Sequence, residues 1–393
     1  MLFRSLNIDV DFYQRSLKHL NELNLQEIDI ISSQLETNTH YYTVKPSEYN
    51  TNCAFCGSTN IVKYGKTMRK LLDLPVRDEK IIINVIVPRY RCNCCNQTFS
   101  HTFQFVDKHA KVTNRLREKI EKLFLYRSLS DISQEYNISV SAIEKIVMKY
   151  IRKQDADRHI ILPELLGIDE AHINKNAYGL FVDIKKHKPI ELLKNNTYNE
   201  MSRFLKSVDY SNVKVVVIDM TPKYKRLIKT IIPDAHIVID KFHIQQDIQK
   251  AFRKELAQYD NVILYEIRTL LLYKRESLSY EQQQLLNEYI SRYPQVSFIY
   301  EIKELLINIY NTTDKDSAKQ IIDKASALIT ADYIFFYHLL KKILYWKQEI
   351  LNYHDYQYTN AVTEGINKRI VQFNYIGNGY SFPILRAKLL YSS

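Results

Sequence analysis

Three short apolar runs in this chain each end in an aspartate, and this feature restricts the possible folds most. The runs are "LLGIDE", "VVVIDM" and "HIVIDK", and they end at Asp169, Asp219 and Asp240. Runs this apolar are typical of strands that are buried on both faces of a sheet. A buried carboxylate without a partner is strongly destabilising, so each acid needs a hydrogen-bond donor, water or a metal ion.

The segments around these acids predict an alternating order of strands and helices. Strands are expected in "ILPELLGIDEAHI", "AYGLFVDIK", "KPIELLK", "VKVVVIDM" and "AHIVIDKFH", and helices in "TYNEMSRFLKSV" and "PKYKRLIKTII". Three strands followed by helix, strand, helix and strand is the chain order of a ribonuclease-H-like fold, a mixed α/β sheet flanked by helices. In that fold the first and fourth strands are neighbours, so Asp169 and Asp219 are expected to converge.

Two converging carboxylates at strand ends indicate a site for hard divalent cations. Phosphoryl transfer can use two Mg²⁺ ions about 4 Å apart, one for the attacking oxygen and one for the leaving oxygen. The alternative for Asp219 is a helix cap, because a Thr-Pro helix start follows it directly. Glu170 is the second choice for the first acid, although it points to the opposite face of the strand from Asp169.

A third acid is expected on a helix near the end of the chain. Residues 244–356 are predicted to be helical without a chemical motif, and Trp346 within them is expected in the core. The segment "YTNAVTEGINKRIVQF" then predicts a helix capped by Thr359 or Asn360, with Val362, Ile366 and Ile370 on its apolar face. The opposite face carries Asn360, Glu364, Asn367 and Lys368.

That face can supply a metal ligand and phosphate contacts together. The alternative for Glu364 is an exposed acid in the first turn, where the helix dipole favours it. Gly365 in the helix interior indicates close approach by another backbone.

All five cysteines lie within 43 residues of the N-terminal part. Cys53 and Cys56 form one C-x₂-C pair, Cys92 and Cys95 form the other, and the insert "KIIINVIVPRYRC" predicts strands. Two such pairs are the ligand pattern of a structural Zn²⁺ in a zinc ribbon. Disulfides are the alternative, but an odd cysteine count argues against them. Cys94 is the expected spare, and His101 is a competing ligand.

Residues 113–150 change to helical periodicity. "TNRLREKIEKLFLYRS" predicts one helix, and "SLSDISQEYNISVSAIEKIVMKYIRK" predicts helix, turn, helix, with Ser139 as the cap of the last helix. Residues 51–150 hold 17 Lys and Arg against 9 Asp and Glu, which is +8 of the net charge of +11. This basic segment indicates a nucleic-acid-binding region, and a solvated basic surface is the alternative.

Together these segments resemble the insertion-sequence transposases of the ISL-three (ISL3) family, which have a DDE-type catalytic domain. The resemblance rests on "RYRCNCCNQTF", "GIDEAH", "VVVIDMTPKY", "PDAHIVIDKFHI" and "TNAVTEGINKRI", in this order. It implies a triad of Asp169, Asp219 and Glu364 with the spacing D-x₄₉-D-x₁₄₄-E, and an all-helical insertion before the glutamate. It also implies that Asp240 and His243, in "DKFH", lie near the site, and a direct metal ligand is the alternative for Asp240.

The resemblance implies a bacterial DNA transposase that binds terminal inverted repeats, cleaves DNA and joins the ends to target DNA. Two Mg²⁺ or Mn²⁺ ions are expected at the triad, and at least a dimer is expected on double-stranded DNA. The expected DNA contacts are Arg115, Arg117, Ser139, Ser141, Lys145, Lys149, Lys368 and Arg369. The alternatives are an inert DNA-binding regulator and a nuclease or resolvase without strand transfer.

These interpretations predict a multidomain α+β chain. The expected parts are an N-terminal segment (1–48), a zinc ribbon (49–106), a helix-turn-helix domain (107–156), a catalytic core (157–243 and 357–393) and a helical insertion (244–356). No apolar run is long enough to span a membrane, and the first residues break into charge, so a soluble cytoplasmic protein is expected.

Overall fold

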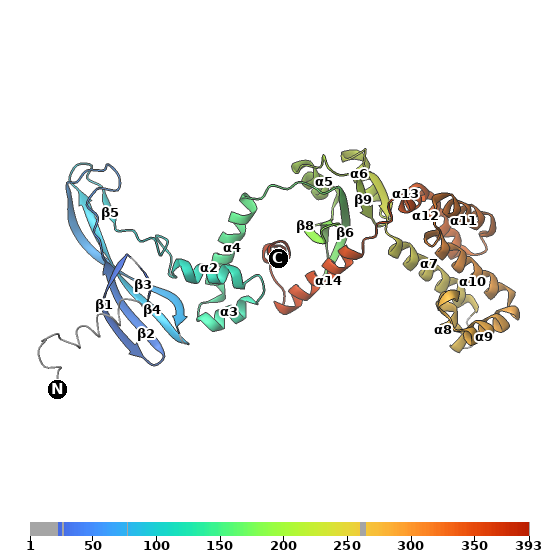
Figure 1. Ribbon diagram of the computed structural model, residues 1–393, viewed down its shortest axis with the longest axis horizontal. Helices are drawn as coiled ribbons and strands as arrows, with labels where there is room; N and C mark the ends of the chain where they lie inside the picture. Colours follow the sequence, from blue (N-terminus) through green and yellow to red (C-terminus); the bar gives the residue numbers. More distant parts are fainter. Residues whose placement is uncertain (1–22, 26, 77, 260–264, 393) are drawn as a thin grey trace, which may run out of the picture. The chain divides into compact units, whose positions relative to one another are not determined.

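The computed structural model describes residues 23–25, 27–76, 78–259 and 265–392. The chain divides into two compact units, residues 1–154 and residues 155–393 (Figure 1). Among the described helices, none is both long and apolar enough to cross a lipid bilayer.

The first unit contains a five-stranded sheet. Its strands are β1 (Ile28–Glu36), β2 (Thr39–Pro46), β3 (Ile61–Val76), β4 (Glu79–Cys92) and β5 (Thr98–Ser100). Their order is β1-β2-β4-β3, with β5 also paired to β4, and β2 runs parallel to β4. Alternate side chains of β4, including Ile83 and Val85, are fully buried and form the core. The sheet therefore takes in two strands from the first 48 residues, where the sequence patterns predict no element.

Three helices follow the sheet in the first unit: α2 (Asn114–Leu123), α3 (Leu129–Tyr136) and α4 (Val140–Ala156). Asn137 ends α3 in the left-handed conformation, with a φ of 50°. The hydroxyl of Ser139 accepts a hydrogen bond from the N–H of Ala142 at 3.3 Å at the start of α4. Ile143 and Val147 are completely buried. The predicted order of helix, turn and helix is therefore present.

The second unit is built on another five-stranded sheet. Its strands are β6 (Leu165–Ile173), β7 (Asn176–Asp183), β8 (Lys188–Leu193), β9 (Val215–Ile218) and β10 (His236–Ile239). They lie in the order β10-β9-β6-β7-β8, with β6, β9 and β10 parallel and the other pairs antiparallel. The first and fourth strands in chain order, β6 and β9, are hydrogen-bonded neighbours, so this prediction is confirmed.

Helices cover both faces of this sheet (Figure 1). On one face, α5 (Tyr198–Ser207) and α6 (Pro222–Ile231) pack on the buried side chains of Leu166 and Ile168. On the other face, α14 (Ala361–Ile376) and α15 (Phe382–Tyr391) pack through Ile370 and Leu389 against Ala171. Helix α14 thereby lies directly beside β6, the strand that carries Asp169.

The predicted insertion is mainly helical in its described part. It consists of α7 (Lys241–Leu256), α8 (Tyr265–Leu272), α9 (Tyr280–Ser291), α10 (Pro294–Ile307), α11 (Lys315–Leu328), α12 (Ile334–Tyr345) and α13 (Lys347–Tyr356), with short 3₁₀ turns at 257–259, 275–277 and 308–310. Its apolar interior is continuous with the core under α5 and α6. Trp346 is 1% exposed, so its predicted place in the core is confirmed.

Candidate active site and thiol cluster

An open pocket of about 460 Å³ lies at the carboxyl ends of β6 and β9. The three predicted triad acids lie in its wall on three different elements: Asp169 on β6, Asp219 directly after β9 and Glu364 on α14. The pocket is lined by these acids and by Glu170, His172, Phe242, His243, Gln246, Asn367 and Lys368. Segments almost 200 residues apart in the sequence therefore meet at one site.

Asp169 is held by its own strand and by α14. Its Oδ1 accepts the N–H of Glu170 at 2.7 Å, and its Oδ2 accepts the amide Nδ2 of Asn367 at 3.1 Å. The same amide donates to the carbonyl of Glu170 at 3.3 Å, so Asn367 ties α14 to β6 beside the carboxylate. Burial raises the pKa of Asp169 to about 6, and the nearby charge of Asp219 adds to this effect.

Asp219 does not cap the helix that follows it. Helix α6 has Thr221 at its N-cap and no side-chain cap hydrogen bond, and Oδ2 of Asp219 accepts only the hydroxyl of Thr221, at 2.8 Å, among the described contacts. Oδ1 of Asp219 is buried and has no hydrogen-bond partner in the described part of the chain. Burial raises the pKa of Asp219. A carboxylate in this position needs a positive charge that these contacts do not supply.

Glu170 faces the other side of the sheet, as the alternation of strand residues predicts. Its Oε1 accepts hydrogen bonds from Nζ of Lys223 at 3.0 Å and from the hydroxyl of Tyr224 at 2.9 Å, both on α6. Nε2 of His172 lies 3.6 Å from its Oε2. Glu170 therefore already has a cation and a neutral donor, unlike Asp219.

Asp240 has a different role from the other two strand-end aspartates. It is 1% exposed, and its Oδ1 accepts the N–H of Phe242 at 3.4 Å as the N-cap of α7 and the N–H of Asn360 at 3.2 Å. Nε2 of His243 lies 3.9 Å from its Oδ2. Asn360 itself is buried, and its Oδ1 accepts the hydroxyl of Thr363. These residues support the pocket wall from behind, and neither Asp240 nor Asn360 lines the pocket.

The close backbone approach predicted at Gly365 is wrong. A Cβ placed on Gly365 meets no atom within 4 Å, and the residue is exposed. The close approach is at Gly167 on β6, where a Cβ would lie 2.9 Å from Oδ1 of Asn360 and 3.1 Å from Oγ1 of Thr363. Helix α14 can therefore lie this close to β6 because the strand, and not the helix, has a glycine at the contact.

The donor set of the pocket fits a hard divalent cation. Its anionic ligands are all carboxylate oxygens, and at least one of these oxygens, Oδ1 of Asp219, is buried without a partner. The carboxylate oxygens of the three acids do not all lie within 4.8 Å of one another, whereas the Sγ atoms of the four clustered cysteines in the described part of the chain do. This spacing leaves room for water and phosphate oxygens, which Mg²⁺ keeps as ligands.

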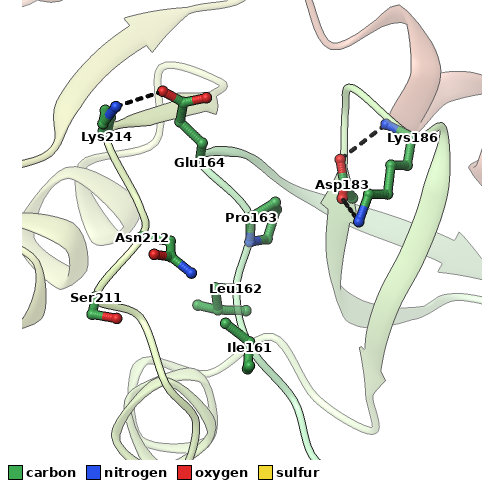
Figure 2. Close-up of a pocket in the computed structure, with 9 residues that line it drawn as sticks. All are labelled: Ile161, Leu162, Pro163, Glu164, Asp183, Lys186, Ser211, Asn212 and Lys214. Carbon is green, nitrogen blue, oxygen red and sulfur yellow. Dashed lines mark hydrogen bonds and ion pairs between the residues drawn. The ribbon is translucent and has the colours of Figure 1, made fainter.

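A separate pocket of about 530 Å³ lies at the opposite end of the same sheet, near the start of β6 (Figure 2). Its acids already have cationic partners. Nζ of Lys214 lies 2.8 Å from Glu164, and Nζ of Lys186 lies 4.0 Å from Asp183 (Figure 2). Together with Lys185, Lys214 holds the pKa of Glu164 down to about 2. This pocket therefore has no uncompensated acid for a cation.

The first unit contains the four predicted cysteine ligands as one cluster. The Sγ atoms of Cys53, Cys56, Cys92 and Cys95 all lie within 4.8 Å of one another. The Cys53–Cys95 and Cys56–Cys92 distances are 3.7 and 3.6 Å, far from a disulfide bond. Four thiolates around one Zn²⁺ with bonds of about 2.3 Å lie about 3.8 Å apart, so the cluster fits a tetrahedral ion.

The backbone of each C-x₂-C turn supports the thiolate form. The N–H of Cys94 donates to Sγ of Cys92 at 3.4 Å, and the N–H of Phe55 donates to Sγ of Cys53 at 3.4 Å. The N–H of Cys95 and that of Cys94 lower the pKa of Cys92 to about 6 against the opposing effect of burial.

The two competing candidates lie outside this cluster. Cys94 is exposed and does not belong to it. Nδ1 of His101 lies 2.6 Å from Oδ1 of Asn50, and this ring is not part of the cluster either.

The residues predicted to contact DNA differ in whether their side chains already have partners within the protein. Arg115 forms an ion pair with Asp73, whose side chain is fully buried, and also donates to the carbonyl of Leu23 at 2.7 Å. Arg117 pairs with Asp107 at 2.7 Å, and Arg369 donates to the carbonyl of Ser392 at 2.8 Å. The guanidinium groups of these three arginines therefore already form ion pairs or hydrogen bonds with other residues of the protein.

The other predicted DNA contacts lie on exposed surface. Ser141, Lys145 and Lys149 are exposed on α4, and Lys149 has an ion pair with Asp107 at 2.8 Å. Lys368 is exposed in the wall of the acidic pocket. Sequence reasoning missed Phe242 and Gln246 in that wall. The signal was available, because both follow Asp240 on one face of α7 at a spacing of four residues.

Comparison with known proteins gives two family matches and one relative. The family model for ISL3 DDE proteins, described as "Transposase", matches residues 166–389, which include all three acids of the pocket. The model described as "zinc-finger of transposase IS204/IS1001/IS1096/IS1165" matches residues 50–95, which include the four clustered cysteines. The "Transposase for insertion sequence element IS1001" of Bordetella parapertussis is 21% identical over 282 residues, covering 68% of this chain and 70% of that protein.

Proposed function

The chain belongs to the ISL3 family of transposases, and from this membership we propose that it binds the ends of its own insertion sequence, cleaves the DNA there and joins the ends to target DNA. The observation that carries the proposal is the pocket that brings Asp169, Asp219 and Glu364 together from β6, β9 and α14. We take the second unit, with its β10-β9-β6-β7-β8 sheet, as a ribonuclease-H-like core interrupted by the helical insertion.

In this proposal Asp169, Asp219 and Glu364 hold two Mg²⁺ or Mn²⁺ ions. Bound there, the ions supply activation of the attacking oxygen and stabilisation of charge on the leaving oxygen. Asn367 keeps the Asp169 carboxylate oriented through its 3.1 Å hydrogen bond. Lys368, exposed one position further along α14, binds a phosphate oxygen of the DNA strand. His243 is placed to act as a further polar contact at the same wall.

The first unit is the proposed recognition module. Its four thiolates hold one structural Zn²⁺, which fixes the ends of β3 and β4. We propose that α3 and α4 form a helix-turn-helix, with Ser141 and Lys145 directed to DNA and Lys149 contributing once DNA phosphates compete for it with Asp107. Arg115, Arg117 and Arg369 are assigned to internal ion pairs and hydrogen bonds instead. Because two terminal repeats must be brought together, the active form on double-stranded DNA is at least a dimer.

The decisive experiment is cleavage of a labelled DNA that carries the element's own ends, in the presence of Mg²⁺. Asp219→Asn keeps the shape of the side chain and removes the charge, and Asp234→Asn is a matched control on an exposed acid in the same unit. The wild type and the control are expected to cut and join, whereas Asp219→Asn binds the DNA without cutting. Cutting without joining would indicate a nuclease or resolvase, and binding without cutting by the wild type would indicate a regulator. Equal activity of all three proteins would contradict the proposed metal site.

A further inference from the structure

A second groove, of about 490 Å³, opens along α7 beside the acidic pocket. Phe242 and Gln246 line both cavities, so the groove begins where the acidic pocket ends. It continues along α7 past Gln249 to Arg253, and Lys274 lies in its wall. From Phe242 to Arg253 the helix rises about 16 Å, which is long enough for a short run of phosphates of one DNA strand.

The groove is cationic. Its wall contains Lys250, Arg253 and Lys274 and no carboxylate. Lys250 has an acidic neighbour, since its Nζ lies 3.8 Å from Asp247. Arg253 and Lys274 make no ion pair within the part of the chain that the structure describes. Cations without an acidic partner in a concave wall attract an anionic polymer such as DNA. The neighbouring pocket, with its three acids, does not attract such a polymer.

Neutral hydrogen-bonding groups lie between these cations. Nε2 of Gln245 is buried in the groove wall and has no acceptor among the described residues. Nε2 of Gln249 donates to the carbonyl of Leu272 at 3.3 Å, whereas its Oε1 is buried without a donor. A buried amide without a partner is costly, and phosphate or base oxygens would satisfy the Gln245 donor.

An exposed aromatic ring stands at the junction of the two cavities. Phe242 is 43% exposed. Trp346, in contrast, is buried and cannot contact a ligand. Aromatic rings exposed in cationic grooves are platforms on which nucleic-acid bases stack. The position of Phe242 places such a platform directly beside the three acids.

We propose that the α7 groove binds the sugar–phosphate backbone of the DNA strand that contains the scissile phosphate, with Phe242 stacked on a base next to it. This inference rests on the proposed function and extends the DNA path beyond the triad. Arg253 and Lys274 contact phosphates, and Gln245 and Gln246 contact phosphate or base oxygens. The groove thereby fixes the strand in line with the acids.

The test uses the full-length protein and the element's end, with 5-iodouracil at the positions beside the scissile phosphate for photo-crosslinking. Arg253→Gln/Lys274→Gln removes two groove charges, and Lys319→Gln/Lys324→Gln removes two exposed charges on α11 as a control. Affinity is measured in Ca²⁺ over a range of salt, and cleavage is measured in Mg²⁺. A third variant, Phe242→Ala, tests the platform.

The groove variant is expected to reduce the slope of log affinity against log salt by about 1.8, whereas the control pair leaves the slope unchanged. Phe242→Ala is expected to raise KM about tenfold and to abolish a crosslink that maps to the peptide containing residue 242. Equal slopes for the groove and control pairs, or a crosslink from these positions that maps only to other peptides, would overturn the proposal. A wild type that crosslinks through Phe242 without cutting would support the groove and refute the proposed cleavage activity, so the two failures are distinguishable.

Discussion

The backbone N–H of Asn360 donates a hydrogen bond to Oδ1 of Asp240 at 3.2 Å and joins the two ends of the helical insertion. Both residues are 1% exposed. The same oxygen accepts the N–H of Phe242, so one carboxylate caps α7 and fixes the start of α14. Because α14 carries Glu364, this hydrogen bond controls where the third acid lies relative to β6 and β9.

Replacing Asp240 by alanine is therefore expected to affect both stability and activity. Asp240→Ala removes a helix cap and leaves the buried N–H of Asn360 without an acceptor, which lowers the free energy of unfolding by about 2–3 kcal/mol. Asp314→Ala is the control, since Asp314 caps α11 through the N–H of Ser317 at 2.8 Å but is exposed and lies far from α14 in sequence. Asp314→Ala is expected to lower the free energy of unfolding by about 1 kcal/mol and to leave DNA cleavage unchanged. Similar urea midpoints and equal cleavage for the two variants would contradict the assigned role of Asp240.

The contact between β6 and α14 can be tested with two glycines. Gly167→Ala places a Cβ within 2.9 Å of Oδ1 of Asn360, and such overpacking is expected to cost about 1–3 kcal/mol and to reduce cleavage. Gly365→Ala meets no atom within 4 Å and is expected to raise the free energy of unfolding by up to about 1 kcal/mol, because alanine favours helix. The changes in unfolding midpoint should therefore have opposite signs. Destabilisation by Gly365→Ala would show that a neighbour approaches the helix there after all.

Zinc content distinguishes the clustered thiols from the spare one. Wild type and Cys94→Ser are expected to contain one zinc per chain, whereas Cys95→Ser loses most of it, because Cys94 is exposed and outside the cluster. Chelation of the wild-type ion should unfold the ribbon and weaken binding to the terminal repeat. Metal analysis and circular dichroism measure these effects. A Cys94→Ser variant without zinc would show that the ligand set is misassigned.

Arg115 and Lys145 are expected to respond oppositely in stability and binding assays. Arg115→Ala leaves the buried carboxylate of Asp73 without its cation, at a cost of about 3 kcal/mol in the free energy of unfolding. Lys145 is exposed and makes no ion pair with the described residues, so Lys145→Ala should reduce the salt slope of DNA binding by about 1. Chemical denaturation and binding titrations over a range of salt separate the two effects. If Arg115→Ala weakened binding without loss of stability, the guanidinium would be a DNA contact.

Lys388 gives a pH-dependent prediction. The residue is 2% exposed, and burial lowers its pKa from 10.5 to about 8. Between about pH 8 and pH 10.5 the unfolded chain binds more protons than the folded protein, so the free energy of unfolding rises with pH. Below about pH 8 Lys388 is charged in both states, and the whole cost of burying that charge is present. Lys388→Met should raise the free energy of unfolding at pH 7 by about 1–3 kcal/mol, an effect that disappears near pH 10.5.

Nζ of Lys388 lies 4.7 Å from the centre of the Tyr380 ring. Loss of this cation–π contact is why the expected gain from Lys388→Met can be as small as about 1 kcal/mol. Urea midpoints at the two pH values measure the effect of Lys388→Met. Lys319→Met on exposed α11 is the control and should shift the midpoint equally at both values. A gain from Lys388→Met that does not depend on pH would mean that Lys388 has the same pKa in the folded and the unfolded chain, so that burial does not lower it.

The sheet of the second unit could be predicted from the sequence because its strands are short, apolar on both faces and separated by amphipathic helices. The neighbouring positions of β6 and β9 then followed from chain order, and with them the convergence of Asp169 and Asp219. Strand β1 could not be predicted in this way. Most of its side chains are exposed, so it has no alternating apolar pattern.

The different roles of the strand-end aspartates also lay beyond the sequence. Asp219 and Asp240 follow almost identical apolar runs, and each precedes a helix. Only the fold shows that Asp240 is a cap whose Oδ1 is bound to the N–H of Asn360, whereas Asp219 is not a cap and lies in the wall of the acidic pocket. The same limitation explains Gly365, because the sequence reveals a glycine in a helix but not the residue that faces it. Long-range partners of this kind are fixed by packing and not by local pattern.

The closure of the insertion at Asp240 and Asn360 has an evolutionary consequence. The chain leaves the sheet and returns to it at one point. The position of Glu364 therefore does not depend on the length of the insertion. Helices outside the α7 groove can be added or lost in the course of divergence without moving Asp169, Asp219 or Glu364. The interval of 144 residues between the second and third acids can therefore vary in length in the helices outside the α7 groove.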